Sequence, residues 1–258
     1  MPMPVNIVFD SFIAGILASL ACGLGVLPLL FPKLNLEKRT GLGYGIAGGL
    51  MFSASVYNLL LPGLSTSGTH LSFNDVAPII IGIGLGAAFI WFAHAKMETN
   101  FDGSNKTKAS TRGQLLIFLA MAIHSIPEGI AVGVGYASGE VFDTDFGSYI
   151  ALAIGIHNIP EGLAVAIPMR AAGATINRCF WAAVLTSIPQ PIAAIPASLA
   201  SWFFQPLMPV LMGFAAGAMI YLVLLELIPV ALEQESPSKT AWFFTIGFCA
   251  MLLVQVIL

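Results

Sequence analysis

Long apolar runs are the feature that most constrains what this chain can fold into. Of its 258 residues, 57% are hydrophobic and only 9% are charged, and the mean hydropathy is +0.89. Soluble domains are about one-quarter charged, so a water-soluble globule is excluded. Each run has roughly 20 residues, the length of a membrane-spanning helix. The runs lie at 12–31, 41–62, 77–95, 114–136, 148–169, 180–204, 207–230 and 241–258.

These runs predict helices rather than strands. Because a bilayer offers backbone groups no hydrogen-bond partner, a spanning segment must be a helix or part of a closed barrel. The alternating pattern of barrel strands is absent. We therefore predict an all-α polytopic membrane protein of eight transmembrane helices, forming a single domain over residues 1–258. We expect the first run to be retained as a span and the three cysteines, Cys22, Cys179 and Cys249, to be buried packing residues.

The basic residues indicate an orientation. By the positive-inside rule, connections rich in Lys and Arg face the cytoplasm. The first, third, fifth and seventh connections hold all 10 of these residues: Lys33, Lys38, Arg39, Lys96, Lys106, Lys108, Arg112, Arg170, Arg178 and Lys239. We therefore predict a multi-pass protein of the inner or plasma membrane with both termini outside. The longest connection, about 96–113, is polar and is expected to be a solvated cytoplasmic linker.

One phrase occurs twice, 33 residues apart. It reads Ile-His-Ser-Ile-Pro-Glu-Gly at 123–129 and Ile-His-Asn-Ile-Pro-Glu-Gly at 156–162. Adjacent spans run antiparallel, so the two copies would be related by a two-fold axis in the membrane plane, as in the inverted repeats of secondary transporters. The proline in each phrase removes a helix hydrogen bond and is expected to bend the helix there.

Each phrase places a histidine and a glutamate on one helical face near the middle of its span. If the two-fold holds, His124 lies level with Glu161, and His157 lies level with Glu128. A carboxylate at this depth costs roughly 3 kcal/mol to insert. Since no Lys or Arg lies within the predicted spans, a bound divalent cation is the expected counter-charge. Two imidazoles and two carboxylates suit Zn²⁺, Fe²⁺, Mn²⁺ or Co²⁺ better than Ca²⁺ or Mg²⁺. Alternatively, each histidine simply shares a proton with its glutamate.

The repeated phrase resembles that of the ZIP (Zrt/Irt-like protein) divalent metal transporters of the bacterial type. The resemblance implies a metal site made by His124, Glu128, His157 and Glu161, with Asn158 beside a second metal. It also implies a 3+2+3 inverted-repeat arrangement, uptake into the cytoplasm, a homodimer, and movement of one helix group against the other. Further phrases similar to the family are Gly49-Leu50-Met51, Pro189-Gln190-Pro191, Ala216-Gly217-Ala218-Met219 and Glu226-Leu227-Ile228-Pro229.

Two residues depart from the family pattern. Ser125 stands where many members have asparagine, and Gln190 stands where many have glutamate. Gln190 removes a negative charge from the second metal position, which favours one dominant ion. The third connection also lacks the histidine-rich tract of many members.

Four residues are candidates for auxiliary or pathway roles: Met51, Ser125, Gln190 and Glu226. Met51 either lends a thioether to the site or fills a gap in the core. Gln190 either lines the pathway or bonds a freed carbonyl, and Glu226 either relays metal or protons toward the cytoplasm or reaches interfacial water. His70 and His94 are interpreted as solvated or interfacial residues rather than ligands.

Together these features predict an importer of divalent transition metals, with zinc first and iron or manganese next. The ion, which could also be cobalt or cadmium, is cargo rather than a cofactor, and we expect no enzyme activity. The expected partners are this ion, the lipid bilayer and a second copy of the chain, while a net charge of -3 gives no basis for binding nucleic acid. Two alternatives remain open: an intramembrane metalloenzyme, although the HExxH motif is absent, and a proton-driven carrier of an organic solute.

Overall fold

The computed structural model describes residues 4–31, 40–65, 72–101, 109–139 and 145–257, and within these ranges the chain is helical and has no strand. The α-helices are α1 (Pro4–Leu24), α2 (Thr40–Ala54), α3 (Leu61–Ser65), α4 (Phe73–Phe101), α5 (Ala109–Ala137), α6 (Phe146–Ala171), α7 (Ile176–Thr186), α8 (Pro189–Phe203), α9 (Met208–Leu222), α10 (Ile228–Gln234) and α11 (Pro237–Ile257). Short 3-10 or π segments adjoin some of them: η1 (Leu27–Leu30), η4 (Ser55–Leu60), η6 (Gln205–Leu207) and η7 (Val223–Leu227).

Over the described residues these segments join into eight rods: α1–η1, α2–η4–α3, α4, α5, α6, α7–α8, η6–α9–η7–α10 and α11. Seven of them are long and apolar enough to cross a membrane by length and composition. The remaining rod, α5, has 29 residues and carries the first of the two repeated phrases. The structure thus confirms the predicted all-helical, polytopic architecture.

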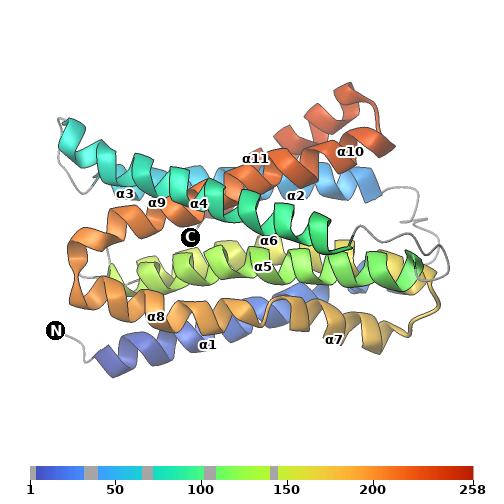
Figure 1. Ribbon diagram of the computed structural model, residues 1–258, viewed down its shortest axis with the longest axis horizontal. Helices are drawn as coiled ribbons and strands as arrows, with labels where there is room; N and C mark the ends of the chain where they lie inside the picture. The colour runs from blue at the N-terminus through green and yellow to red at the C-terminus, as the bar shows by residue number, and fades with distance from the viewer. Residues whose placement is uncertain (1–3, 32–39, 66–71, 102–108, 140–144, 258) are drawn as a thin grey trace.

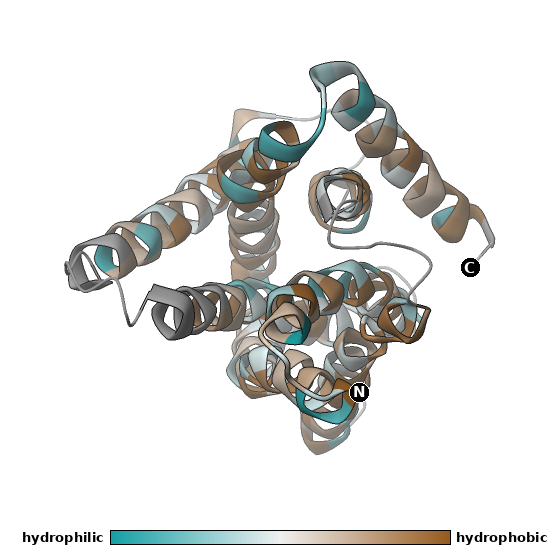
Figure 2. Cartoon of the chain, turned by 90° about the vertical axis from the view of Figure 1, so that its right-hand side faces the viewer, coloured by the Kyte–Doolittle hydropathy of each residue, from teal (hydrophilic) through white to brown (hydrophobic). Residues whose placement is uncertain are grey.

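The rods run along the long axis of the molecule and reverse direction at each connection (Figure 1). The described rod ends that adjoin the first, third, fifth and seventh connections lie at the right-hand end of Figure 1, which faces the viewer in Figure 2. Four basic residues belong to this end: Lys96 near the end of α4, Arg170 in the last turn of α6, Arg178 in the first turn of α7, and Lys239 in the first turn of α11. We call it the basic end.

The rods sort into two groups, one above the other in both views (Figures 1 and 2). The first group contains α1, α5, α6, α7 and α8, and the second contains α2, α3, α4, α9, α10 and α11. The most extensive contacts lie within a group, between α4 and α9, α5 and α8, and α2 and α11. Contacts of α5 with α9 and of α6 with α2 join the two groups.

Glycine allows the helices within each group to touch through their backbones. A Cβ atom built on Gly86 of α4 would overlap the carbonyl oxygen of Phe214 in α9, and one on Gly49 of α2 would overlap the carbonyl oxygen of Phe244 in α11. Small residues at contacts are the usual basis of helix association in membranes, where lipid removes the hydrophobic drive for helices to pair. Large apolar side chains such as Trp91 remain exposed, as contact with lipid tails requires.

Two rods contain a π segment that the sequence analysis did not predict. In η4 the N–H of Leu61 donates to the carbonyl of Val56, and in η7 the N–H of Ile228 donates to the carbonyl of Val223. A proline, which has no N–H to donate, follows each of these donors directly. The wider hydrogen-bonding pattern therefore occurs where proline disturbs the ordinary helix.

The structure corrects two sequence-based expectations. The predicted linker at 96–113 is shorter, because α4 continues to Phe101 and α5 begins at Ala109, leaving 102–108 outside the described residues. Extending an existing helix through residues such as Ala, Lys, Met and Glu costs little free energy. Of the three cysteines, Cys249 is exposed rather than buried.

Gly86→Ala is expected to destabilise the protein by about 1–3 kcal/mol, because the new methyl group forces the α4 and α9 backbones apart. Unfolding of the purified protein in mixed micelles measures this. Gly84→Ala, two residues away, is the matched control, since a Cβ there has nothing within 4 Å. Equal stability of the two variants would contradict the backbone contact.

Candidate metal centre

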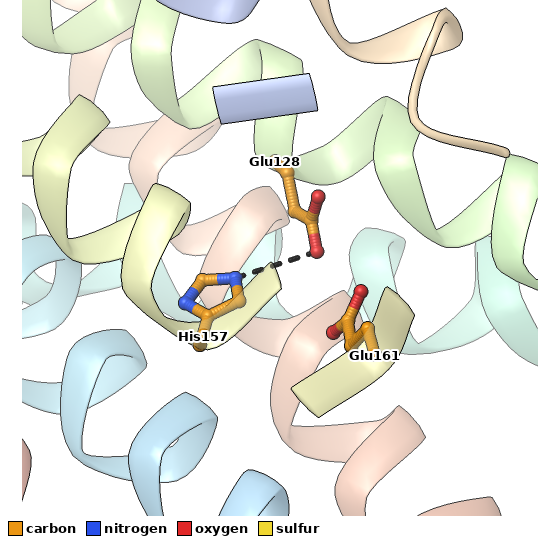
Figure 3. A group of neighbouring side chains, drawn as sticks. All are labelled: Glu128, His157 and Glu161. Carbon is orange, nitrogen blue, oxygen red and sulfur yellow. Dashed lines mark ion pairs between the residues drawn. The ribbon is translucent and has the colours of Figure 1, made fainter. Parts of the chain in front are cut away.

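Three buried side chains from α5 and α6 face one another (Figure 3). They are Glu128, His157 and Glu161, exposed by 0%, 1% and 3%, and we call them the buried group. One potential ligand atom from each lies within 4.8 Å of the other two. Nε2 of His157 is 3.4 Å from Oε1 of Glu128.

The repeated phrase explains how these side chains are positioned. His157 and Glu161 are four residues apart on α6 and so lie on one face, one turn from each other. The glycine after each glutamate packs against a neighbouring backbone, because a Cβ on Gly129 would overlap the Gln190 carbonyl oxygen and one on Gly162 would overlap the Cys22 carbonyl oxygen. In each phrase the glycine therefore packs against a neighbouring helix, α8 for Gly129 and α1 for Gly162, and the glutamate before it belongs to the buried group.

The polar atoms of the buried group lack hydrogen-bond partners within the described part of the chain. These atoms are both carboxylate oxygens of Glu128, Oε1 of Glu161 and both ring nitrogens of His157. Burying such groups without compensation is costly. Neither glutamate forms an ion pair with a described Lys or Arg.

The spacing in the buried group suits a shared cation. The separation of 3.4 Å between His157 and Glu128 exceeds an ordinary hydrogen bond. Two ligands on one tetrahedral zinc ion lie about 3.4 Å apart. Two carboxylates would also balance the charge of a dication, so this arrangement can hold Zn²⁺ or a similar ion.

The structure places His124 outside this group. Its Nε2 atom lies 3.7 Å from Oε1 of Glu226 in η7, and Nε2 of His94 lies 3.6 Å from the same oxygen. His124 precedes Glu128 by one turn on α5 and thus lies nearer the basic end. Four side chains were predicted to converge, and the structure brings three of them together.

His94 is a residue that sequence reasoning set aside. It was interpreted as interfacial or solvated, but it faces Glu226 and its side chain is 30% exposed. One signal was available: His94 is the only ionisable side chain in the long apolar stretch between Asp75 and Lys96.

Asn158, Gln190 and Ser125 connect the site to the surrounding helices. Nδ2 of Asn158 donates to Oε1 of Gln190 at 3.0 Å and to the carbonyl oxygen of Ala18 at 3.2 Å. Oδ1 of Asn158 and Nε2 of Gln190 are buried without a partner in the described structure. The hydroxyl of Ser125 donates to the carbonyl oxygen of Thr186.

Met51 lies in the largest apolar core. It is 1% exposed and packs with a cluster of buried residues drawn from both helix groups. This placement agrees with a packing role.

The sequence is similar to known zinc transporters. A family model described as "ZIP Zinc transporter" matches residues 91–255. Zinc transporter GufA of Myxococcus xanthus is 33% identical over 91% of this chain and 95% of its own length. Zinc transporter ZIPB of Bordetella bronchiseptica is 30% identical over 92% of this chain and 78% of its own length. A putative zinc transporter of Arabidopsis thaliana is 36% identical over 90% of this chain, which spans 36% of that relative's length.

Glu161→Gln and Glu128→Gln are each expected to weaken Cd²⁺ binding about 10- to 100-fold or more. Loss of a residue that only supports a metal ligand already has an effect of about this size. Each change removes a negative charge while keeping the size of the side chain. Titration calorimetry of the purified protein measures the effect. Glu233→Gln on the exposed side of α10 is the control, and equal affinity in all three variants would exclude the buried group as a cation site.

Proposed function

Because the chain belongs to the ZIP zinc transporter family, we propose that it transports zinc across the membrane into the cytoplasm through the buried group. The observation that carries this proposal is the pair of buried glutamates beside His157, which form no ion pair with any Lys or Arg in the described ranges. A travelling dication supplies the missing charge. In this role the metal is cargo, and the protein is a transporter rather than an enzyme.

We assign the primary ligands to Glu128, His157 and Glu161. The unpartnered Oδ1 of Asn158 and the imidazole of His124 are available to complete the coordination during transport. Zinc accepts this mixture of nitrogen and oxygen ligands, and iron or manganese can use the same donors. The amide of Asn158 is held by Gln190 and Ala18, which favours one ion rather than two at this position.

The arrangement of the rods supports the proposed topology. We place the basic end in the cytoplasm and both termini outside, because Lys and Arg favour the cytoplasmic side. The second and seventh rods each contain a π segment with a proline two residues after it, Pro62 and Pro229. That correspondence supports a single 3+2+3 domain in which rods one to three repeat as rods six to eight, with α5 and α6 between them.

The proposed transport cycle follows from these positions. A hydrated cation comes from outside and exchanges water for the carboxylates and imidazole of the buried group. It displaces any protons held there, since metal ligands must be deprotonated. Movement of the first helix group against the second then opens the site toward the basic end, where Glu226 assists release. We also propose that the protein works as a homodimer.

Glu128→Ala combined with Glu161→Ala is expected to reduce zinc uptake by proteoliposomes to background, because the cation loses both compensating charges. A zinc-sensitive dye inside the vesicles measures uptake. Glu233→Ala should retain the flux of the unmodified protein. Unchanged flux in the double variant would remove the buried group from the pathway.

Zinc uptake is expected to have a higher KM at lower external pH, because protons compete with the ion for histidine and glutamate. The measurement is initial uptake at several zinc concentrations and pH values. Glu128→Gln should show a weaker pH dependence, since one competing carboxylate is gone. A KM that stays constant or falls on acidification would contradict direct competition.

A further inference from the structure

A large cavity lies at the end of the molecule opposite the basic end. Its volume is about 810 Å³, and it is bounded by the start of α1, the end of α5, the start of α6 and the end of α8 with η6 (Figure 1). We call it the α1 cavity. We propose that it binds the headgroup of an aminophospholipid, whose ammonium group pairs with the carboxylate of Asp10.

Charge in the α1 cavity favours a cationic ligand. Among the described residues that line it, Asp10 is the only charged one. Its side chain is exposed and forms no ion pair with a described Lys, Arg or His. The described Lys and Arg residues all lie toward the basic end of the molecule. A cation carried by a ligand is therefore the counter-charge that fits this cavity.

The position of Asp10 along its rod matches the headgroup region of a bilayer. The apolar span Val5–Leu30 has 26 residues, or about 39 Å at the rise of an α-helix. A bilayer with its headgroups is about 40–45 Å thick, and its hydrocarbon core is about 30 Å. Asp10 lies five residues after Val5, about 8 Å along the axis. The carboxylate is thus placed near the boundary between headgroups and acyl chains.

The walls of the α1 cavity are apolar and open to lipid. Phe9, Ile13 and Leu17 are exposed and follow one another at intervals of four residues, so they form one face of α1 that runs from Asp10 toward the middle of the bilayer. Opposite them, Trp202 and Phe203 pack edge to face with ring centroids 4.8 Å apart. A small water-soluble cation would gain little from these walls, whereas the acyl chain of a lipid can lie along them.

The remaining polar groups suit the phosphate of a zwitterionic headgroup. The amides of Asn6 and Gln205 and the hydroxyls of Tyr136 and Ser148 line the same cavity. The two hydroxyl oxygens lie 3.4 Å apart. These groups can donate hydrogen bonds to phosphate oxygens, but the carboxylate of Asp10 repels a lipid with net negative charge. The volume falls within the range of about 300–1,000 Å³ that is typical of ligand sites.

Fluorescence of Trp202 tests the proposal, because its ring lines the cavity. In a variant that keeps this tryptophan alone, the exposed Trp91, Trp181 and Trp242 are changed to phenylalanine. The variant is reconstituted in phosphatidylcholine vesicles that contain a lipid with brominated acyl chains, which quenches nearby tryptophan. Brominated phosphatidylethanolamine should reach half-maximal quenching at a mole fraction about threefold or more below that of brominated phosphatidylglycerol, as a partly exposed charge pair would give. Brominated phosphatidylcholine, whose headgroup has no N–H to donate, should lie between them.

Asp10→Asn in this background should remove the preference, because the amide carries no charge. Glu233→Gln, which neutralises an exposed carboxylate on α10, is the matched control and should keep it. A second control keeps Trp91 alone, on the exposed surface of α4, and should show no preference for any headgroup. Equal quenching of Trp202 by the three lipids, or a preference that survives Asp10→Asn, would overturn the proposal. Neither result depends on zinc transport.

Discussion

Two buried carboxylates that have no basic partner among the described residues are the constraint on which this structure depends. Glu128 and Glu161 are 0% and 3% exposed and make no ion pair with a described Lys or Arg. Charges buried in this way must be protonated, paired or bound to metal. With His157 beside them at a spacing that suits zinc ligands, a bound dication would satisfy all three side chains together. In the proposed function, binding of the ion therefore removes the unfavourable repulsion between the two buried carboxylates.

The helices pack more tightly within each of the two groups than between them. Within each group, glycines such as Gly86 and Gly129 bring backbones into direct contact, so neighbouring helices cannot slide past one another without collision. Between the groups, the contact of His124 with Glu226 joins α5 to η7 through longer polar side chains. Such contacts can rearrange at lower cost than packed backbones. In the proposed cycle, the ion therefore changes partners at the boundary where the two groups meet.

The sequence predicted the helices and all three residues of the buried group, because apolar length defines a span and the i, i+4 spacing defines a face. It could not predict the partner of His124, since rotation of α5 relative to its neighbours decides whether that imidazole meets Glu161 or Glu226. The contact of His94 with Glu226 was not predicted for the same reason: the two residues are remote in the chain, and only tertiary packing brings them together. Each π segment lies just before a proline, but the wider hydrogen-bonding pattern depends on backbone geometry that composition does not encode.

The most direct measurement of the central claim is anomalous X-ray scattering at the zinc edge from crystals of the zinc-loaded protein. The account predicts a zinc peak at about 2.0–2.2 Å from a carboxylate oxygen of Glu128, a carboxylate oxygen of Glu161 and Nε2 of His157. Zinc found only at the protein surface, with the two glutamates hydrogen-bonded to neighbouring groups and no ion between them, would contradict it.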